Sequence, residues 1–303
     1  MTAKRAAIWG GRLLALVSLV YLGWAAARHW HDLGDWRPTG PAIGLLVVLP
    51  VVYGVSLLLI GEAWHQLIGG FAGRSLDRRT AIASYGVTQV AKYLPGNVFH
   101  YVGRHLWLSR LGVPHKALAL GVAWETVLLA GSAVAVAAAA VFVAAISPPD
   151  IAGQPARFWA AIALVAGGCL LAALLALPHR VLRLRAVVPP RSALLRALGA
   201  YLVFFSIQGL AFALLFVAVG ATPVLLAVGI AGLSWVAGFL TPGAPGGIGS
   251  RELVLTTLAA PLVGTAPALI LSALFRLVTT LGDVVCFAIS KRLAPMPAEA
   301  AAS

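Results

Sequence analysis

Two arginines in this chain follow Pro-Gly turns at the same spacing, inside otherwise apolar sequence. Arg104 comes eight residues after Gly96, and Arg251 comes eight residues after Gly243. A guanidinium group can hold a phosphate or a carboxylate through two parallel hydrogen bonds. A helix that begins after such a turn offers backbone N–H groups and a dipole that also favour an anion. The spacing therefore predicts an anion site, of a kind that suits the phosphate of a lipid head group.

The two turns are rich in glycine, which lets the backbone approach a ligand closely and adopt positive φ. Pro95 and Pro242 are offset by 147 residues, as are the two arginines. A broken apolar segment in each half of a chain is typical of transporters with a central site, so we predict pseudo-repeats over residues 1–146 and 156–292. The predicted head-group contacts are Arg104, Arg251, Gly96, Asn97, Gly243, Gly246, Gly247 and Gly249.

The elements that must position these residues are transmembrane helices. Hydrophobic residues make up 61% of the 303 residues and charged residues only 10%, whereas soluble domains carry about 25% charged residues. Two interrupted segments, Thr80–Arg110 and Pro223–Val263, are predicted to be re-entrant helical hairpins, because a broken backbone at membrane depth must face protein or a water-filled cavity. Runs of about 20 apolar residues can cross a bilayer. Six such runs predict full crossings: Ile8–Ala27, Pro41–Ile60, Ala117–Ile146, Ala156–Leu177, Ala197–Val219 and Ala266–Ile289.

The basic residues set the predicted orientation. Fifteen of them fall on one side of this arrangement and three on the other, and basic loops stay in the cytoplasm. Each half then has three full crossings and one hairpin, so the second half is inverted relative to the first. The expected fold is an all-α integral membrane protein, a polytopic bundle that forms one transmembrane domain over residues 1–303. Both termini are predicted to be cytoplasmic, with residues 293–303 as a short tail.

The net charge of +13 follows from these loops, which attract anionic lipid head groups, and no nucleic-acid partner is expected. No cofactor and no metal site are expected either. Glu62 and His65 have the Glu-x-x-His spacing of metal sites in helical bundles, but the spacing occurs once, whereas such sites need several ligands.

Eight charged residues fall within the apolar segments, where a charge costs about 2.5–3.5 kcal/mol on insertion scales. Four are positive and four negative, so we favour charge balance over proton coupling for the acids, although both stay open. If the two arginines are structural instead, the expected pairs include Arg251 with Glu125 and Arg104 with Glu252. The charges that we expect to support the site are Lys92, Glu125, Glu252, Arg276 and Asp283.

The motifs resemble a known family. The stretch Pro-Gly-Gly-Ile-Gly-Ser-Arg-Glu from Pro245 to Glu252 resembles the Pro-Gly-Gly-x-Gly-x-x-Glu signature of the lysylphosphatidylglycerol synthase transmembrane region, also called flippase-like. The Tyr-Leu-Pro-Gly-Asn run that begins at Tyr93, followed by Arg104, looks like the first-half motif of that family, with Asn97 where a second glycine is common. The resemblance covers nearly the whole chain. It implies a lipid translocase fold with two re-entrant hairpins that face a central cavity, in a stand-alone member without the soluble synthase domain.

The sequence thus favours a lipid translocase of the bacterial inner membrane, rather than an enzyme. It would move an anionic phospholipid, or a polyprenyl-phosphate or glycolipid carrier, between leaflets. One alternative is a membrane-embedded lipid-phosphate transferase or phosphatase that uses His100 or His105 as its base. Another is a non-catalytic lipid-binding partner of an envelope-synthesis complex. The expected partners are membrane lipids, and a homo-oligomer or an envelope-synthesis enzyme partner stays open.

Overall fold

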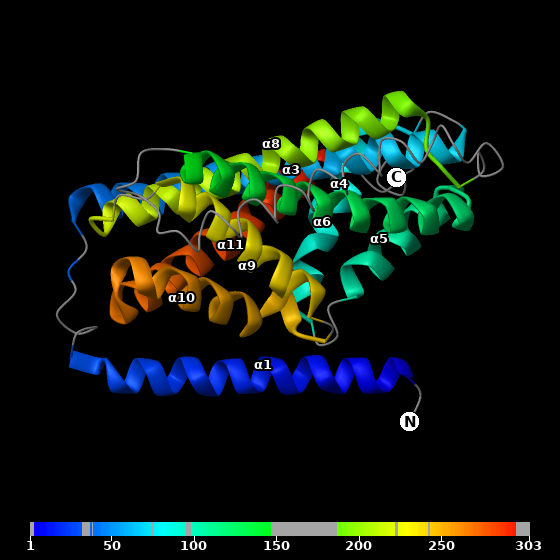
Figure 1. Cartoon of the computed structure of the whole chain (residues 1–303). Coiled ribbons are helices and arrows are strands. Elements are labelled where there is room, and N and C mark those ends of the chain that lie inside the picture. Colours follow the sequence, from blue (N-terminus) through cyan, green and yellow to red (C-terminus); the bar gives the residue numbers. More distant parts are fainter. Residues whose placement is uncertain are drawn as a thin grey trace, which may run out of the picture.

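The computed structural model describes residues 3–31, 37, 39–73, 76–94, 98–146, 187–221, 224–241 and 243–294. Within these ranges the chain forms helices and no strand, as Figure 1 shows. The prediction of a helical membrane protein is therefore confirmed.

Four helices are long and apolar enough to cross a bilayer: α3 (Gly40–Ala72), α6 (His115–Ile146), α8 (Arg191–Ala218) and α11 (Thr265–Leu293). Each has at least 28 residues, whereas about 20 residues cross the hydrocarbon layer. The predicted crossings Pro41–Ile60, Ala117–Ile146 and Ala266–Ile289 lie entirely within α3, α6 and α11. Helix α8 contains the predicted crossing Ala197–Val219 except for its last residue. Helix α3 packs against both α8 and α11.

The two remaining predicted crossings have different outcomes. The run Ile8–Ala27 lies in α1 (Ala3–Arg28), a helix that runs along the side of the bundle and contacts α10 (Ser250–Val263) and α11 (Figure 1). Its well-described apolar part covers only Leu16–Arg28, so a crossing by α1 stays a prediction. The run Ala156–Leu177 lies outside the described residues.

Both interrupted segments consist of helices too short to cross alone. The first contains α4 (Arg78–Gln89), the 3-10 turn η1 (Val90–Tyr93) and α5 (Phe99–Arg110). The second contains α9 (Val224–Leu240), η3 (Pro245–Gly247) and α10. None of the four α-helices α4, α5, α9 and α10 exceeds 17 residues. The helices thus end where the sequence predicts the breaks.

Local chemistry explains these helix ends. Helix α4 begins at Asp77, whose carboxylate accepts a 2.8 Å hydrogen bond from the backbone N–H of Thr80, a standard N-cap. Helix α10 begins after Gly249, whose φ of +89° favours a residue without a side chain. The same backbone N–H of Gly249 donates to the Glu252 carboxylate at 2.7 Å. Both capping carboxylates sit at the positive end of a helix dipole.

Close helix packing holds the middle of α11 against α3. A Cβ atom on Gly54 would lie 2.6 Å from the carbonyl oxygen of Gly282, so the two backbones touch there. Small residues permit such close approach between membrane helices. The contact fixes the positions of the two adjacent residues, Tyr53 before Gly54 and Asp283 after Gly282. Both line the wall of a cavity.

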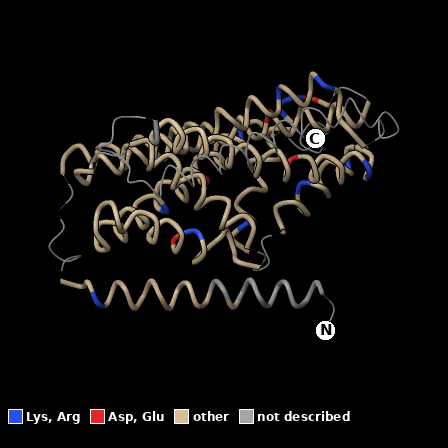
Figure 2. The backbone as a smooth tube through the Cα atoms, in the orientation of Figure 1, with Lys and Arg blue, Asp and Glu red and all other residues tan. Residues whose placement is uncertain are grey.

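Charged residues are sparse along the long helices (Figure 2). Basic residues gather at the end of the molecule where α8 begins and where α5 passes into α6. This distribution is the one from which the cytoplasmic side was predicted; the orientation itself stays a prediction.

Candidate functional site

A cavity of about 500 Å³ lies among the long helices and the two interrupted segments. Its wall is mostly apolar, with side chains such as Leu57, Leu129, Phe204, Trp235 and Phe239. A large apolar cavity with a few convergent polar groups is the usual form of a ligand site. The described charged side chains at its wall are Lys92, Glu125, Arg251, Arg276 and Asp283.

The cavity brings together most of the residues that the sequence singled out. Besides the charges, Gly243, Gly246 and Gly247 line it. Gly249 and Glu252 lie just behind the wall, bound to each other. Arg104 does not line the cavity. Gly96 and Asn97 lie outside the described residues.

Arg104 is held in a buried ion pair. Its two terminal nitrogens donate to the Oε1 and Oε2 atoms of Glu125 at 3.2 and 2.7 Å, and the two side chains are only 1% and 2% exposed. The guanidinium carbon lies 3.8 Å from the ring centre of Trp64 and 5.1 Å from that of Tyr85, which adds cation–π attraction. Its Nε alone lacks a partner in the described part of the chain. For Arg104 to bind a head group, Glu125 would have to release it.

The ion pairs in the structure differ from the structural pairs that the sequence predicted. Glu125 was expected to pair with Arg251, and Glu252 with Arg104. The structure instead pairs Glu125 with Arg104, and Glu252 with Arg276 at 3.3 Å. The reason is that α6 supplies Glu125 to the first segment, whereas Glu252 lies on α10 beside α11.

Arg251 is buried without an ion-pair partner among the described residues. It is 9% exposed, and its Nη2 atom has no hydrogen-bond partner in this part of the chain. Its guanidinium carbon lies 5.1 Å from the ring centre of Phe275. A buried charge with no counter-charge is strongly unfavourable, so an anion in the cavity would relieve this cost.

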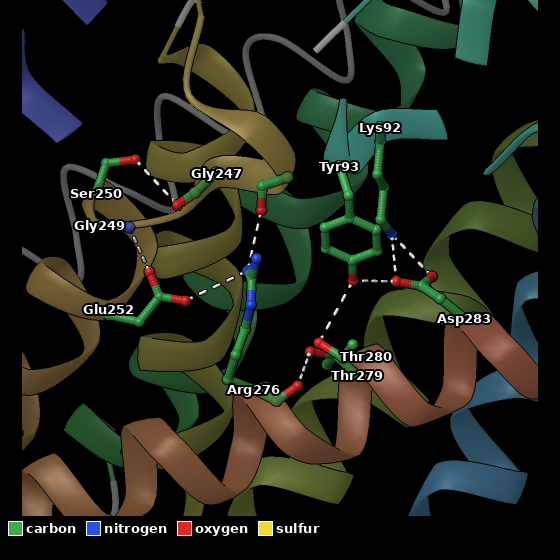
Figure 3. A network of polar contacts seen from close by, with 11 residues as sticks. Lys92, Tyr93, Gly247, Gly249, Ser250, Glu252, Arg276, Thr279, Thr280 and Asp283 are labelled. Carbon is green, nitrogen blue, oxygen red and sulfur yellow. Dashed lines mark hydrogen bonds and ion pairs between the residues drawn. The ribbon is translucent and has the colours of Figure 1, made fainter. Parts of the chain in front are cut away.

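Arg276 lies beside it and is only partly satisfied. Its Nη1 donates to the Gly246 carbonyl at 3.0 Å. The same nitrogen pairs with Glu252, as Figure 3 shows. Its Nη2 is buried and has no partner among the described atoms. The Glu252 carboxylate has a second partner, because it also accepts a hydrogen bond from the backbone N–H of Gly249. The Gly249 N–H at the start of α10 is therefore already bonded within the protein.

A third ion pair links the first interrupted segment to α11. The Lys92 ammonium lies 2.8 Å from both carboxylate oxygens of Asp283, and the Tyr93 hydroxyl donates to its Oδ2 atom at 2.5 Å (Figure 3). Tyr93 also lies against the second break, since a Cβ on Gly246 would be 2.9 Å from its ring. The two breaks thus contact each other, through η1 and η3, as expected for segments that approach each other.

Sequence reasoning missed several residues of the site. Tyr93 was not predicted as a contact, although it begins the first-half motif and directly follows Lys92 at the break. The aromatic side chains of the wall were not predicted either. The two histidines of the enzymatic alternative separate: His100 lines the cavity, whereas His105 is half-buried outside it and lies 2.8 Å from His115. His65 bonds the Leu76 carbonyl at 3.0 Å.

Comparison with known proteins adds no identification. The chain matches no model of a known protein family, and a search of curated proteins found no match. The assignment of function therefore rests on the geometry of the cavity and on the motifs described above.

Proposed function

We propose that this protein is a lipid translocase of the flippase-like kind in the bacterial inner membrane. It moves an anionic phospholipid, or a polyprenyl-phosphate or glycolipid carrier, between the leaflets. The observation that carries the proposal is Arg251, a buried cation that lacks a described acidic partner and stands at the wall of a large, mostly apolar cavity. A cavity of that composition suits a ligand with an anionic head and apolar chains.

In this proposal the two interrupted segments are re-entrant hairpins of an inverted repeat, and they enter from opposite leaflets with both termini in the cytoplasm. The contact between η1 and η3 supports this arrangement, because breaks of two opposed hairpins would meet near the middle of the membrane. The lipid head group binds Arg251 in the cavity while the acyl chains follow the apolar wall. Movement of one hairpin against the other then opens the cavity toward either leaflet.

The test is lipid movement in proteoliposomes with the variant Arg251→Ala. We expect at least a tenfold loss of movement of an anionic phospholipid, because an anion in an apolar cavity needs its counter-charge. Arg251→Lys should also be impaired, since an ammonium group loses the bidentate geometry of the guanidinium. Arg110→Ala, an exposed arginine at the end of α5, is the matched control and should leave movement unchanged. Wild-type movement in Arg251→Ala would contradict the proposal.

A second candidate function has one observation in its favour. The Nδ1 atom of His100 is buried at the cavity wall without a described partner, so His100 is placed to act as a base on a bound lipid phosphate. Purified protein incubated with lipid phosphates tests this alternative by product analysis. Turnover that is lost in His100→Ala but kept in His105→Ala would favour an enzyme over a translocase.

A further inference from the structure

We propose that the cavity selects a phosphodiester that carries one negative charge over a phosphomonoester that carries two. This inference rests on the proposed function, because it names the class of head group that the translocase accepts. It follows from the ion pairs around the cavity and from the charge that they leave unbalanced.

Among the described residues, the ionised lysine, arginine, aspartate and glutamate side chains around the cavity carry a net charge of +1. Three described cations are each matched by a carboxylate: Arg104 by Glu125, Lys92 by Asp283, and Arg276 by Glu252. Arg251 is the remaining cation, and it forms no ion pair with a carboxylate of the described residues. A bound monoanion brings the local charge to zero, whereas a dianion leaves one negative charge buried.

The three carboxylates are fixed by contacts that do not involve a ligand. Glu125 is bound by two nitrogens of its arginine. Asp283 is bound by both Lys92 and the Tyr93 hydroxyl. Glu252 is bound by Arg276 and by the Gly249 backbone. Since each carboxylate has two anchors, the charge of the cavity is set before a lipid enters.

The unpartnered donors suit a phosphate group. The Nη2 atoms of Arg251 and Arg276 are both buried without a described partner, and both side chains line the cavity. A phosphodiester has two non-bridging oxygens and a phosphomonoester has three, so either could supply one oxygen to each of these nitrogens. The preference for the diester follows from the charge alone. The two side chains are adjacent at the wall, where they also enclose a second, much smaller pocket.

The test measures binding of three lipids with the same acyl chains to the purified full chain in detergent. The probes are phosphatidylglycerol, a phosphodiester with one charge, phosphatidic acid, a phosphomonoester, and diacylglycerol, which has no phosphate. At about pH 8.5 the monoester carries close to two charges, because the second pKa of a phosphomonoester is about 6 in a protein side chain. We expect phosphatidylglycerol to bind at least tenfold more tightly than phosphatidic acid.

Variants that add one positive charge should reverse the preference. Glu252→Gln frees Arg276 while the new amide oxygen still accepts from Gly249, and Asp283→Asn frees Lys92 in the same way. Both should shift the ratio toward phosphatidic acid by at least tenfold. Glu62→Gln is the matched control, because Glu62 pairs with Arg78 away from the cavity; it should leave the ratio unchanged.

The outcomes separate this inference from the proposed function. Wild-type binding of phosphatidic acid that equals or exceeds that of phosphatidylglycerol would overturn the inference alone. The same holds if the ratio does not change in the folded variants Glu252→Gln and Asp283→Asn. Binding of both phospholipids no tighter than that of diacylglycerol would overturn the inference and the proposed function together.

Discussion

Arg104 and Arg251 stand at the same distance after the two Pro-Gly turns, but the two halves of the molecule treat them differently. Arg104 is 1% exposed, bonded twice to Glu125 and stacked on Trp64. Arg251 is almost as buried, yet it has no described counter-charge and reaches the cavity wall. The first arginine is therefore neutralised within the fold, and the second has no ion-pair partner among the described residues.

The difference comes from the helix that each arginine faces. Helix α6 presents a glutamate to Arg104, whereas α11 presents Phe275 and a further arginine to the neighbourhood of Arg251. Equal spacing after a turn thus predicts that two residues are related in position. It does not predict that they share a role, because the role depends on the neighbouring helix.

The largest effect is expected when the ion pair of Arg104 with Glu125 is disrupted. Arg104→Ala leaves Glu125 buried without its partner, which should lower the free energy of unfolding by about 3–5 kcal/mol. Unfolding of the purified protein in detergent measures this loss, and Arg251→Ala should cause no comparable destabilisation.

A double variant provides the control for that measurement. Arg104→Met combined with Glu125→Gln removes both charges, and it should recover most of the stability, since a removed ion pair leaves no orphan charge. Equal destabilisation by the alanine variants of Arg104 and Arg251 would erase the proposed distinction.

A smaller effect is expected where the two breaks touch. Gly246→Ala places a Cβ at φ +55°, about 2.9 Å from the Tyr93 ring and 3.3 Å from the Nη2 of Arg276. Backbone strain alone should cost about 1–2 kcal/mol, and displacement of Arg276 should reduce lipid movement several-fold. Gly73→Ala is the matched control, with φ +63° and no atom within 4 Å. Gly73→Ala should show the backbone strain without the loss of lipid movement. Equal lipid movement in Gly246→Ala and Gly73→Ala would contradict a role of the second break in the site.

The smallest effect concerns stability of the first half away from the cavity. Asp77→Ala removes the N-cap of α4 and should cost about 1 kcal/mol without changing lipid movement. Hydrogen bonds from the backbone and hydroxyl of Thr80 lower the pKa of Asp77, so the cap stabilises above the ordinary carboxyl pKa. Its contribution is lost as the pH falls through that lowered pKa.

Unfolding measured from neutral to acidic pH should therefore show the difference between Asp77→Ala and wild type shrinking as the pH falls. Asp77→Asn keeps a capping oxygen and should remain close to wild type at neutral pH. A difference that grows in acid would contradict the assigned sign.

The sequence by itself determined which stretches are helical and where they break. Four predicted crossings coincide with long apolar helices, and the helices stop on either side of the two Pro-Gly turns, because apolar length and turn residues act locally along the chain. Only the tertiary structure decided how the charges pair. Lys92 and Asp283 are 191 residues apart, and Arg104 and Glu125 are 21 apart. Such partners are set by which helix faces pack together, and that packing pairs Arg104 with Glu125 but leaves Arg251 without an ion-pair partner among the described residues.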